Sequence, residues 1–148
     1  MKIALACSPG GHMLQLQQLK NVWKDYDTVW ITFRRQMSEE LAKTAKVRFI
    51  IDPRRNPLLL LFNVAQSLLS ALIIRPKVVI ANGGGVVVPF CWLAYLFGAK
   101  IIFIESFSRV ERPSWSGRLI HPIASLFIVQ WKNLVRFYPK AVYGGPIF

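Results

Sequence analysis

Short β-rich runs alternate with helix-like stretches from one end of this chain to the other, and this alternation constrains the fold more than any other feature. Runs rich in Val, Ile and Phe predict strands at residues 2–6, 28–33, 47–51, 78–81, 100–104 and 126–130. Helices are predicted between them at residues 12–23, 38–43, 57–74, 87–97 and 115–120. Strands separated by crossover helices pair in parallel, and near-continuous apolar strands indicate a sheet covered on both faces. The sequence therefore predicts an α/β fold with a single Rossmann-like, doubly wound parallel sheet.

The chain has 148 residues without a linker or a repeat, which fits one domain spanning residues 1–148. Two full α/β domains do not fit in that length, so a function that needs two requires a partner. A hydrophobic share of 53% excludes a disordered basic tail protein. Cys7 and Cys91 lie far apart in apolar surroundings, so we expect both to be reduced and buried. The start, MKIALACSPGG, favours a strand over a secretory signal because Pro9 interrupts the apolar run.

The segment Pro57–Ile74, PLLLLFNVAQSLLSALII, approaches the roughly 20 apolar residues of a membrane-spanning helix. Its polar residues, however, recur at i, i+3, i+4 and i+7 and form one narrow stripe, which favours a helix that packs or lies against something. A core helix and a helix on a membrane surface both remain open, since one helix can serve both purposes on different faces. Cations at its ends would be attracted to anionic lipid by about 1 kcal/mol each. The residues expected to contact a membrane are Leu58, Leu61, Phe62, Leu68 and Leu69, with Arg54, Arg55 and Arg75.

Two glycine-rich loops follow predicted strands, where ligands bind in such sheets. In SPGGH, Gly10 and Gly11 precede a helix whose amino-terminus suits an anion, although no GxGxxG or P-loop pattern is present and an ordinary tight turn is the alternative. His12 opens that helix and is a candidate general base, with a capping or hydrogen-bonded structural histidine as the alternative. In the second loop, Gly83, Gly84 and Gly85 form a candidate phosphate or sugar cradle.

A third loop, ESFSRVERPSWSGR at residues 105–118, gathers arginines and serines after the fifth predicted strand. Arginine suits phosphate oxygens and serine suits sugar hydroxyls, so Ser106, Arg109 and Arg112 are candidate ligands of a diphosphate-linked saccharide. A solvated surface loop is the alternative. Glu105 immediately follows an apolar strand, so we expect it near the other two loops, where it orients His12 or binds an acceptor hydroxyl.

Composition bears on the remaining classes of function. The only histidines are His12 and His121 and no paired Asp motif occurs, so we expect no metal and no cofactor. A formal charge of +12 invites a nucleic-acid-binding function. Against it, the basic residues are spread along the chain without an RRM, KH or helix-turn-helix pattern, so no nucleic-acid partner is expected.

The motifs SPGGH, NGGGVVVPF and IESFSRVERPSWSGR, in this order, resemble the amino-terminal, acceptor-binding half of GT-B glycosyltransferases of the lipid-II N-acetylglucosaminyltransferase type. In particular, they resemble the family of the membrane-anchor subunit of the dolichol-pathway second-GlcNAc transferase and its bacterial relatives in capsule and exopolysaccharide assembly. The resemblance covers nearly the whole chain and ends at residues 143–146, where a single-chain relative would cross to its second domain.

The resemblance implies a split enzyme that transfers a sugar from a UDP-sugar to a polyprenyl-diphosphate-linked saccharide. This chain would bind the acceptor at the cytoplasmic face of the plasma membrane as a peripheral protein, and a second small subunit would bind the nucleotide sugar. His12 would be the general base, beside the two glycine loops, with Glu105 and Ser106 at the acceptor pocket. The chain alone would be inactive. A non-catalytic membrane scaffold that recruits an enzyme is the alternative, but it leaves the three motifs without a purpose.

Overall fold

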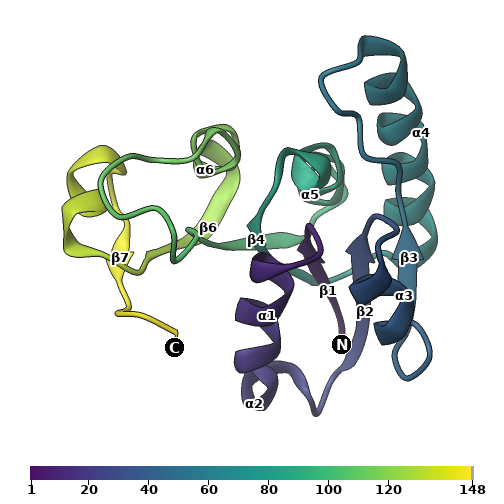
Figure 1. The fold of residues 1–148 in the computed structure, drawn as a ribbon, viewed down its shortest axis with the longest axis horizontal. Helices are drawn as coiled ribbons and strands as arrows, with labels where there is room; N and C mark the ends of the chain where they lie inside the picture. Colours follow the sequence, from purple (N-terminus) through teal and green to yellow (C-terminus); the bar gives the residue numbers. More distant parts are fainter. Residues whose placement is uncertain (148) are drawn as a thin grey trace.

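The computed structural model describes residues 1–147, so Phe148, the last residue of the expected domain, lies outside the described residues. Its strands form one parallel sheet in the order β3-β2-β1-β4-β5-β6-β7 (Figure 1). The strands are β1 (Lys2–Cys7), β2 (Asp27–Thr32), β3 (Val47–Phe49), β4 (Val78–Gly83), β5 (Lys100–Ile104), β6 (Ala124–Val129) and β7 (Val142–Tyr143). The order reverses between β1 and β4, which confirms the predicted doubly wound sheet.

Each of the five predicted helices overlaps an observed helix, in the same order, and the structure adds one break and three 3₁₀ turns. They are α1 (Gly11–Gln18), α2 (Lys20–Trp23), α3 (Gln36–Leu41), α4 (Pro57–Ile74), α5 (Val88–Leu96) and α6 (Trp115–Ile120), with 3₁₀ turns η1 (Gly85–Val87), η2 (His121–Ile123) and η3 (Lys132–Phe137). The predicted helix at 12–23 is interrupted at Leu19, so α1 and α2 are separate. Strand β7 was not predicted, because two residues are too few to show a pattern.

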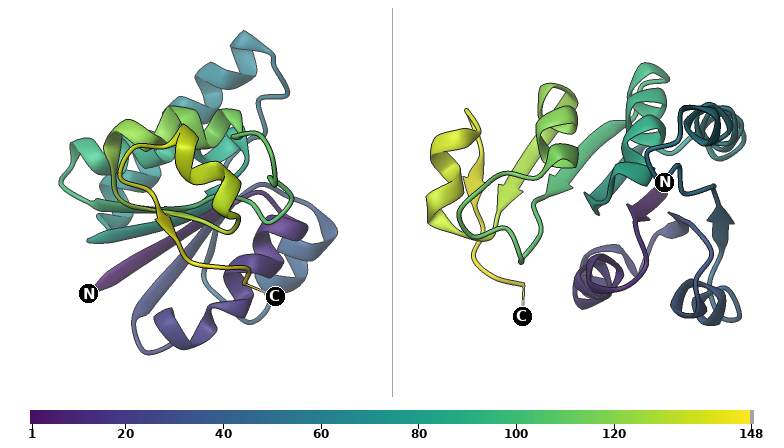
Figure 2. Two further views of the ribbon diagram at one scale, coloured as in Figure 1. Left: turned by 90° about the vertical axis from the view of Figure 1, so that its left-hand side faces the viewer. Right: turned by 45° about the horizontal axis from the view of Figure 1, so that its top comes forward.

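The helices cover the sheet in two layers, with α1, α2 and α3 on one face and α4, α5 and α6 on the other (Figure 2). Alternate residues of β1 supply the two cores, since successive side chains of a strand point to opposite faces. Leu5 and Cys7 pack with Met13 and Leu16 of α1. The small side chains of β1 face the other core, which includes Ala71 of α4 and Cys91 of α5. Both cysteines are free and buried, as predicted.

Helix α4 attaches to the domain through its polar stripe. Asn56 caps its amino-terminal end, where Asn56 Oδ1 accepts hydrogen bonds from the backbone N–H groups of Leu58 and Leu59. The buried Asn63 donates to the backbone oxygens of Ile51 (2.8 Å) and Val86 (3.0 Å). These bonds satisfy a polar group that would otherwise be costly to bury, so the stripe faces the protein.

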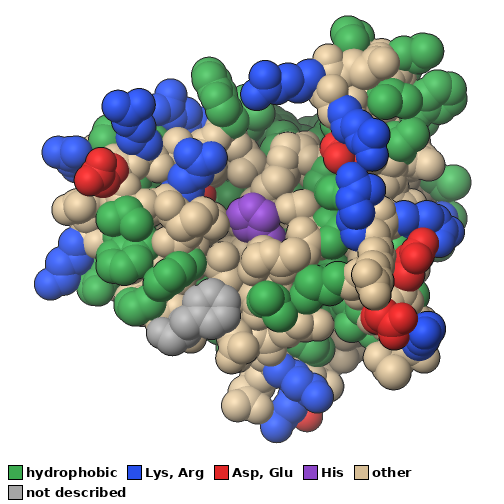
Figure 3. Space-filling model, viewed as in Figure 1, with side chains coloured by type: hydrophobic (Ala, Val, Ile, Leu, Met, Phe, Trp, Pro, Cys, Tyr) green, Lys and Arg blue, Asp and Glu red, His purple; other side chains and the backbone are tan. Residues whose placement is uncertain are grey.

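Most of the other side chains of α4 face outward and are apolar. The outer apolar face consists of the exposed side chains of Leu58, Leu60, Leu61, Phe62, Val64, Leu68, Leu69, Leu72 and Ile73. Figure 3 shows hydrophobic side chains gathered over the upper right of the molecule, where Figure 1 places α4. Among the described residues, α4 is the one helix long and apolar enough to cross a membrane, and 28% of it is buried. A purely core helix is therefore wrong, because most of its apolar side chains do not reach the core.

Candidate functional site

The two glycine loops meet at the carboxyl edge of the sheet, where β1 and β4 are neighbours. The Ser8 backbone N–H donates to the Gly83 backbone oxygen at 3.3 Å, which joins the loops directly. Gly83 has a φ of +118°, and a Cβ added there would lie 2.9 Å from Cε1 of His12. Only glycine combines that backbone conformation with so close an approach. The structure thus brings together the SPGGH and NGGG motifs as the sequence predicts.

His12 is held by a hydrogen bond to Asn82. Its Nδ1 lies 3.1 Å from Asn82 Oδ1. Asn82 Nδ2 donates to the backbone oxygen of Ile104 at 3.0 Å, which fixes the amide so that its oxygen faces the imidazole. The tautomer that fits this contact therefore has its proton on Nδ1, which donates to Asn82, and Nε2 is its acceptor nitrogen. This arrangement can take a proton from a hydroxyl group bound in front of Nε2.

The backbone explains why Asn82 reaches this position. In the register of β1 with β4, Ala6 pairs with Ala81 but Cys7 pairs with Gly83, so Asn82 is an extra residue in β4. Such bulges re-aim a side chain and are frequent beside active sites.

Asn82 belongs to a buried network of amide side chains. Gln15 Oε1 accepts from Asn82 Nδ2 (3.3 Å), from the Phe107 backbone N–H (3.1 Å) and from Gln130 Nε2 (2.8 Å). Gln130 also donates to the Glu105 backbone oxygen at 2.9 Å. The network ties α1 to the ends of β4, β5 and β6. Sequence reasoning missed Gln15, Asn82 and Gln130 as individual residues, although Gln15 lies one helical turn after His12.

Glu105 is placed differently from the expectation. Its side chain is fully buried, and its carboxylate accepts from Ser106 N (3.0 Å), Ser114 N (3.1 Å), Ser114 Oγ (2.7 Å) and Tyr138 Oη (2.6 Å). Burial and the hydrogen bond to this carboxylate raise the pKa of Tyr138, so the phenol remains a donor. Asn82, rather than Glu105, is therefore the hydrogen-bond partner that orients His12. Glu105 instead closes the loop at residues 105–118.

The other candidate residues of that loop differ in burial. Ser106 is buried beside Ser108, with 3.0 Å between the hydroxyl oxygens. Arg109 and Arg112 are exposed. Arg112 lines a hollow of about 590 Å³ with Arg118 and Arg136, formed by the loop and η3 rather than by the glycine loops. The structure thus does not gather Arg112 with His12. Among residues 1–147, no group of three or more His, Cys, Asp or Glu side chains comes together as a metal site.

The residues expected at a membrane surround α4. Leu58, Leu61, Phe62, Leu68 and Leu69 are all exposed. Arg54, Arg55 and Arg75 are exposed too, and all three have left-handed backbone conformations, with φ of 46°, 60° and 47°. Arg75 directly follows Ile74, the last residue of α4. Cations thus flank the outer apolar face at both ends.

Comparison with known proteins places this geometry in context. The sequence profile of the family described as "Oligosaccharide biosynthesis protein Alg14 like" matches residues 33–147, which include the second and third loops but not SPGGH. The UDP-N-acetylglucosamine transferase subunit ALG14 of Mus musculus is 43% identical over 80 residues, covering 50% of this chain and 37% of that protein. Its counterpart in Candida albicans is 42% identical over 77 residues, covering 48% and 35%. The chain thus spans little more than a third of the length of these relatives.

Solved structures agree on the fold. Acinetobacter baumannii MurG superimposes with a TM-score of 0.76 at 17% identity, covering 99% of this chain and 46% of that chain. The UDP-N-acetylglucosamine 2-epimerase of Rickettsia bellii gives a TM-score of 0.69 at 10% identity, covering 93% and 40%. The fold is therefore the Rossmann-like amino-terminal half of GT-B enzymes, as predicted.

Proposed function

The chain belongs to the Alg14-like family of oligosaccharide biosynthesis proteins, and we propose that it is the acceptor-binding, membrane-associated subunit of a two-component glycosyltransferase. The reaction transfers a sugar from a UDP-sugar to a saccharide on a polyprenyl diphosphate, in capsule or exopolysaccharide biosynthesis. The observation that carries the proposal is His12, held by its hydrogen bond to Asn82 between two glycine loops at the switch point of half a GT-B fold.

In the proposed reaction, His12 Nε2 accepts the proton of the acceptor hydroxyl as its oxygen attacks the anomeric carbon of the donor sugar. The bond between that carbon and the UDP oxygen breaks, and UDP leaves with the electron pair. Asn82 holds the imidazole with Nδ1 protonated and thereby keeps Nε2 available. Gly10, Gly11, Gly83, Gly84 and Gly85 let the backbone approach the acceptor. The proposal assigns the nucleotide-sugar pocket to the partner subunit, and the single Rossmann-like sheet of residues 1–147 supports this division. No cofactor takes part.

Membrane association is proposed from the outer apolar face of α4 and the cations at its ends. An apolar helix face combined with attraction to anionic lipid gives two binding signals, which peripheral proteins need for stable attachment. Because the polar stripe is bonded to the protein, α4 would lie along the surface of the cytoplasmic leaflet rather than cross it.

Reconstitution tests the division of labour. A UDP-sugar panel is incubated with membranes that carry polyprenyl-diphosphate saccharides, and sugar transfer is measured with this chain alone, the partner subunit alone, and both together. Transfer only by the pair supports the proposal. Transfer by the partner alone at the same rate would instead favour the scaffold alternative.

A further inference from the structure

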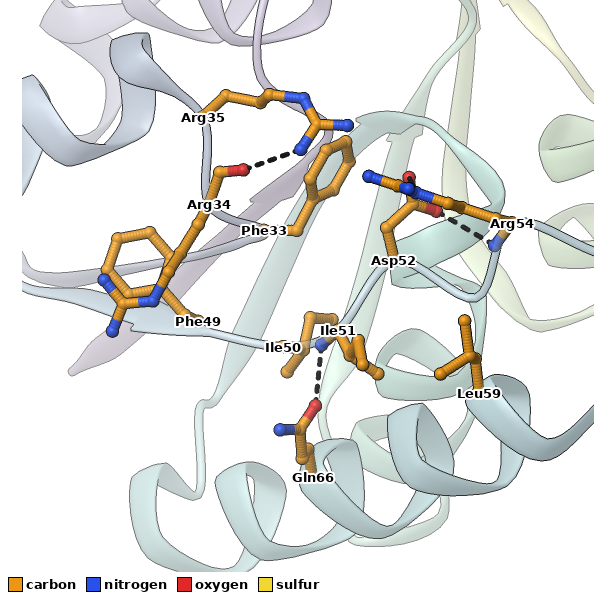
Figure 4. A pocket seen from close by; sticks show the side chains of 10 residues that line it. All are labelled: Phe33, Arg34, Arg35, Phe49, Ile50, Ile51, Asp52, Arg54, Leu59 and Gln66. Atoms are coloured by element: carbon orange, nitrogen blue, oxygen red, sulfur yellow. Dashed lines mark hydrogen bonds and ion pairs between the residues drawn. The ribbon is translucent and has the colours of Figure 1, made fainter. Parts of the chain in front are cut away.

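A second hollow of the carboxyl edge lies between the loop after β2 and the first turns of α4, and we call it the arginine pocket. It has a volume of about 430 Å³. Its lining, drawn in Figure 4, consists of Phe33, Arg34, Arg35, Phe49, Ile50, Ile51, Asp52, Arg54, Leu59 and Gln66. We propose that this pocket binds a phosphate or diphosphate group carried on an apolar chain.

The positive charge of the pocket comes from three arginines on two segments. Figure 4 shows Arg35 and Arg54 approaching from opposite sides, with the Phe33 ring between them. The Arg35 guanidinium lies 4.9 Å from the Phe33 ring centre, and that of Arg34 lies 4.2 Å from the Phe49 ring centre. Stacking on aromatic rings orients a guanidinium while leaving edge N–H groups for a ligand. Arg35 Nη1 donates to the Arg34 backbone oxygen at 3.0 Å, which fixes this guanidinium further and leaves its other N–H groups for a ligand. Planar forks held in this way suit the oxygens of a phosphate.

Carboxylates offset this charge only in part. Asp52 Oδ2 lies 3.9 Å from Arg54 Nε, and Glu39 Oε1 lies 3.9 Å from Arg34 Nη1. Both distances are long for an ion pair, and both arginine side chains are about two-thirds exposed (66% and 68%), so these pairs are weak. An anion of two or more charges would therefore find cations that are not firmly engaged.

The other half of the lining is apolar, which indicates a ligand with a hydrocarbon part. Ile50, Ile51 and Leu59 form this side. Leu59 lies on α4 one helical turn before the exposed Phe62, so the pocket borders the outer apolar face. A free inorganic phosphate would leave the apolar side unused. A phosphate on a lipid chain would place its charge on the arginines and its chain along α4.

The arginine pocket also adjoins the first glycine loop. Arg35 lines a neighbouring hollow together with Pro9 and Gly10. A prenyl diphosphate on Arg35 and Arg54 could thus extend its saccharide toward His12. This step rests on the proposed function, and it assigns the diphosphate of the acceptor to arginines that the sequence analysis did not group together.

The test measures ligand binding directly. Titration calorimetry of the whole chain with farnesyl diphosphate compares wild type with Arg35→Gln/Arg54→Gln, and with Lys20→Gln/Lys24→Gln as a charge-matched control at the two ends of α2, outside the pocket lining. We expect affinity at least about tenfold lower in the arginine variant and unchanged in the control. Inorganic pyrophosphate should bind the wild type more weakly than farnesyl diphosphate. Equal affinities for farnesyl diphosphate in all three proteins, or equal losses in both variants, would overturn the proposal.

Vesicle arms distinguish the source of the phosphate. Flotation is measured with phosphatidylcholine vesicles that contain either a polyprenyl diphosphate or phosphatidylglycerol. If the arginine variant binds less only to the vesicles with polyprenyl diphosphate, the pocket binds the acceptor diphosphate. If it binds less only to the vesicles with phosphatidylglycerol, the pocket binds a phospholipid headgroup. Sugar transfer by the pair separates this inference from the proposed function. If ligand binding depends on the arginines but the pair transfers no sugar, the arginine pocket stands and the proposed function is wrong. If the pair transfers sugar but ligand binding does not depend on the arginines, the proposed function stands and the arginine pocket is wrong.

Discussion

His12 Nδ1 and Asn82 Oδ1 lie 3.1 Å apart although the residues are 70 positions apart in the chain. The hydrogen bond joins the two glycine loops through a ring nitrogen of His12. Because the Asn82 amide is fixed from its other side by Ile104 and Gln15, the orientation of the imidazole depends on the folded sheet.

Asn82→Ala tests whether this bond positions His12. Without the acceptor at Nδ1, the imidazole is free to rotate and to carry its proton on either nitrogen. We expect kcat of the reconstituted pair to fall about 100-fold, the lower end of a general-base contribution, with a much smaller change in KM. Asn133→Ala is the control, because Asn133 is exposed on η3, and we expect it to leave kcat unchanged. A rise in KM with normal kcat in Asn82→Ala would contradict a positioning role.

Gly83→Ala and Gly85→Ala compare neighbours within one motif. A Cβ at position 83 meets the His12 ring at 2.9 Å and requires a φ of +118°, whereas one at position 85 meets nothing within 4 Å. We expect Gly83→Ala to lower the free energy of unfolding by about 1–3 kcal/mol and Gly85→Ala to change it far less. Urea unfolding followed by circular dichroism measures both. Equal losses would show that Gly83 is not specially required.

Tyr138→Phe removes one donor from the buried Glu105 carboxylate. The phenol donates at 2.6 Å, and its loss leaves a carboxylate oxygen of a fully buried residue with fewer partners. We expect the free energy of unfolding to fall by about 1–3 kcal/mol. Tyr95→Phe is the control, because Tyr95 is exposed on α5. No difference between the two variants would contradict the structural role given to Glu105.

Alkaline pH should destabilise the fold through buried thiols. Burial raises the pKa of Cys91 to about 12 and that of Cys7 above its ordinary value of 9.0. The folded protein therefore keeps protons that the unfolded chain releases, and this stabilising contribution is complete below the unfolded pKa and declines as pH rises above it. Urea unfolding between pH 8 and 11 should show a shallower decline in Cys91→Ala than in wild type. An equal or steeper decline in the variant would be inconsistent with this assignment.

Leu61→Ser/Leu69→Ser tests the membrane role of α4. Both side chains are more than half exposed (65% and 53%), so we expect unfolding stability to change by less than about 0.5 kcal/mol per residue. Each substitution would remove about 1.5–3 kcal/mol of the free energy gained by burying the leucine side chain in lipid, so vesicle affinity should fall at least about tenfold. Val22→Ser is the control, since Val22 is 59% exposed on α2, away from α4. Unchanged vesicle affinity in the double variant would exclude the outer apolar face as the contact.

The sheet could be predicted from sequence because its strands are apolar runs separated by helices of suitable length. The contact between the SPGGH and NGGG loops could be predicted as well, since these loops directly follow two strands that are neighbours at the switch point. The sequence did not predict which face of α4 packs against the sheet, because a narrow polar stripe can either face water or form hydrogen bonds inside the protein. Hydrogen bonds from Asn63 to Ile51 and Val86 decide it, and they join segments far apart in the chain.

Glu105 and the buried amide network at the site could not be predicted either, because their hydrogen bonds also join distant parts of the chain. A carboxylate after a strand resembles a catalytic group, but its donors Ser114 and Tyr138 lie 9 and 33 positions further on. Gln15 and Gln130 are 115 positions apart and meet only in the folded protein. Their residue types carry no distinctive pattern, so sequence alone does not single them out.

The most direct measurement of the central claim is the rate of sugar transfer by the reconstituted pair carrying His12→Ala, beside the pair carrying His121→Gln. His121 is the other histidine of the chain, and its Nε2 lies 2.8 Å from the Pro139 backbone oxygen, outside the glycine loops. We predict a loss of at least about 100-fold for His12→Ala and a rate within about twofold of wild type for His121→Gln. A His12→Ala pair that transfers sugar as fast as wild type would contradict the account.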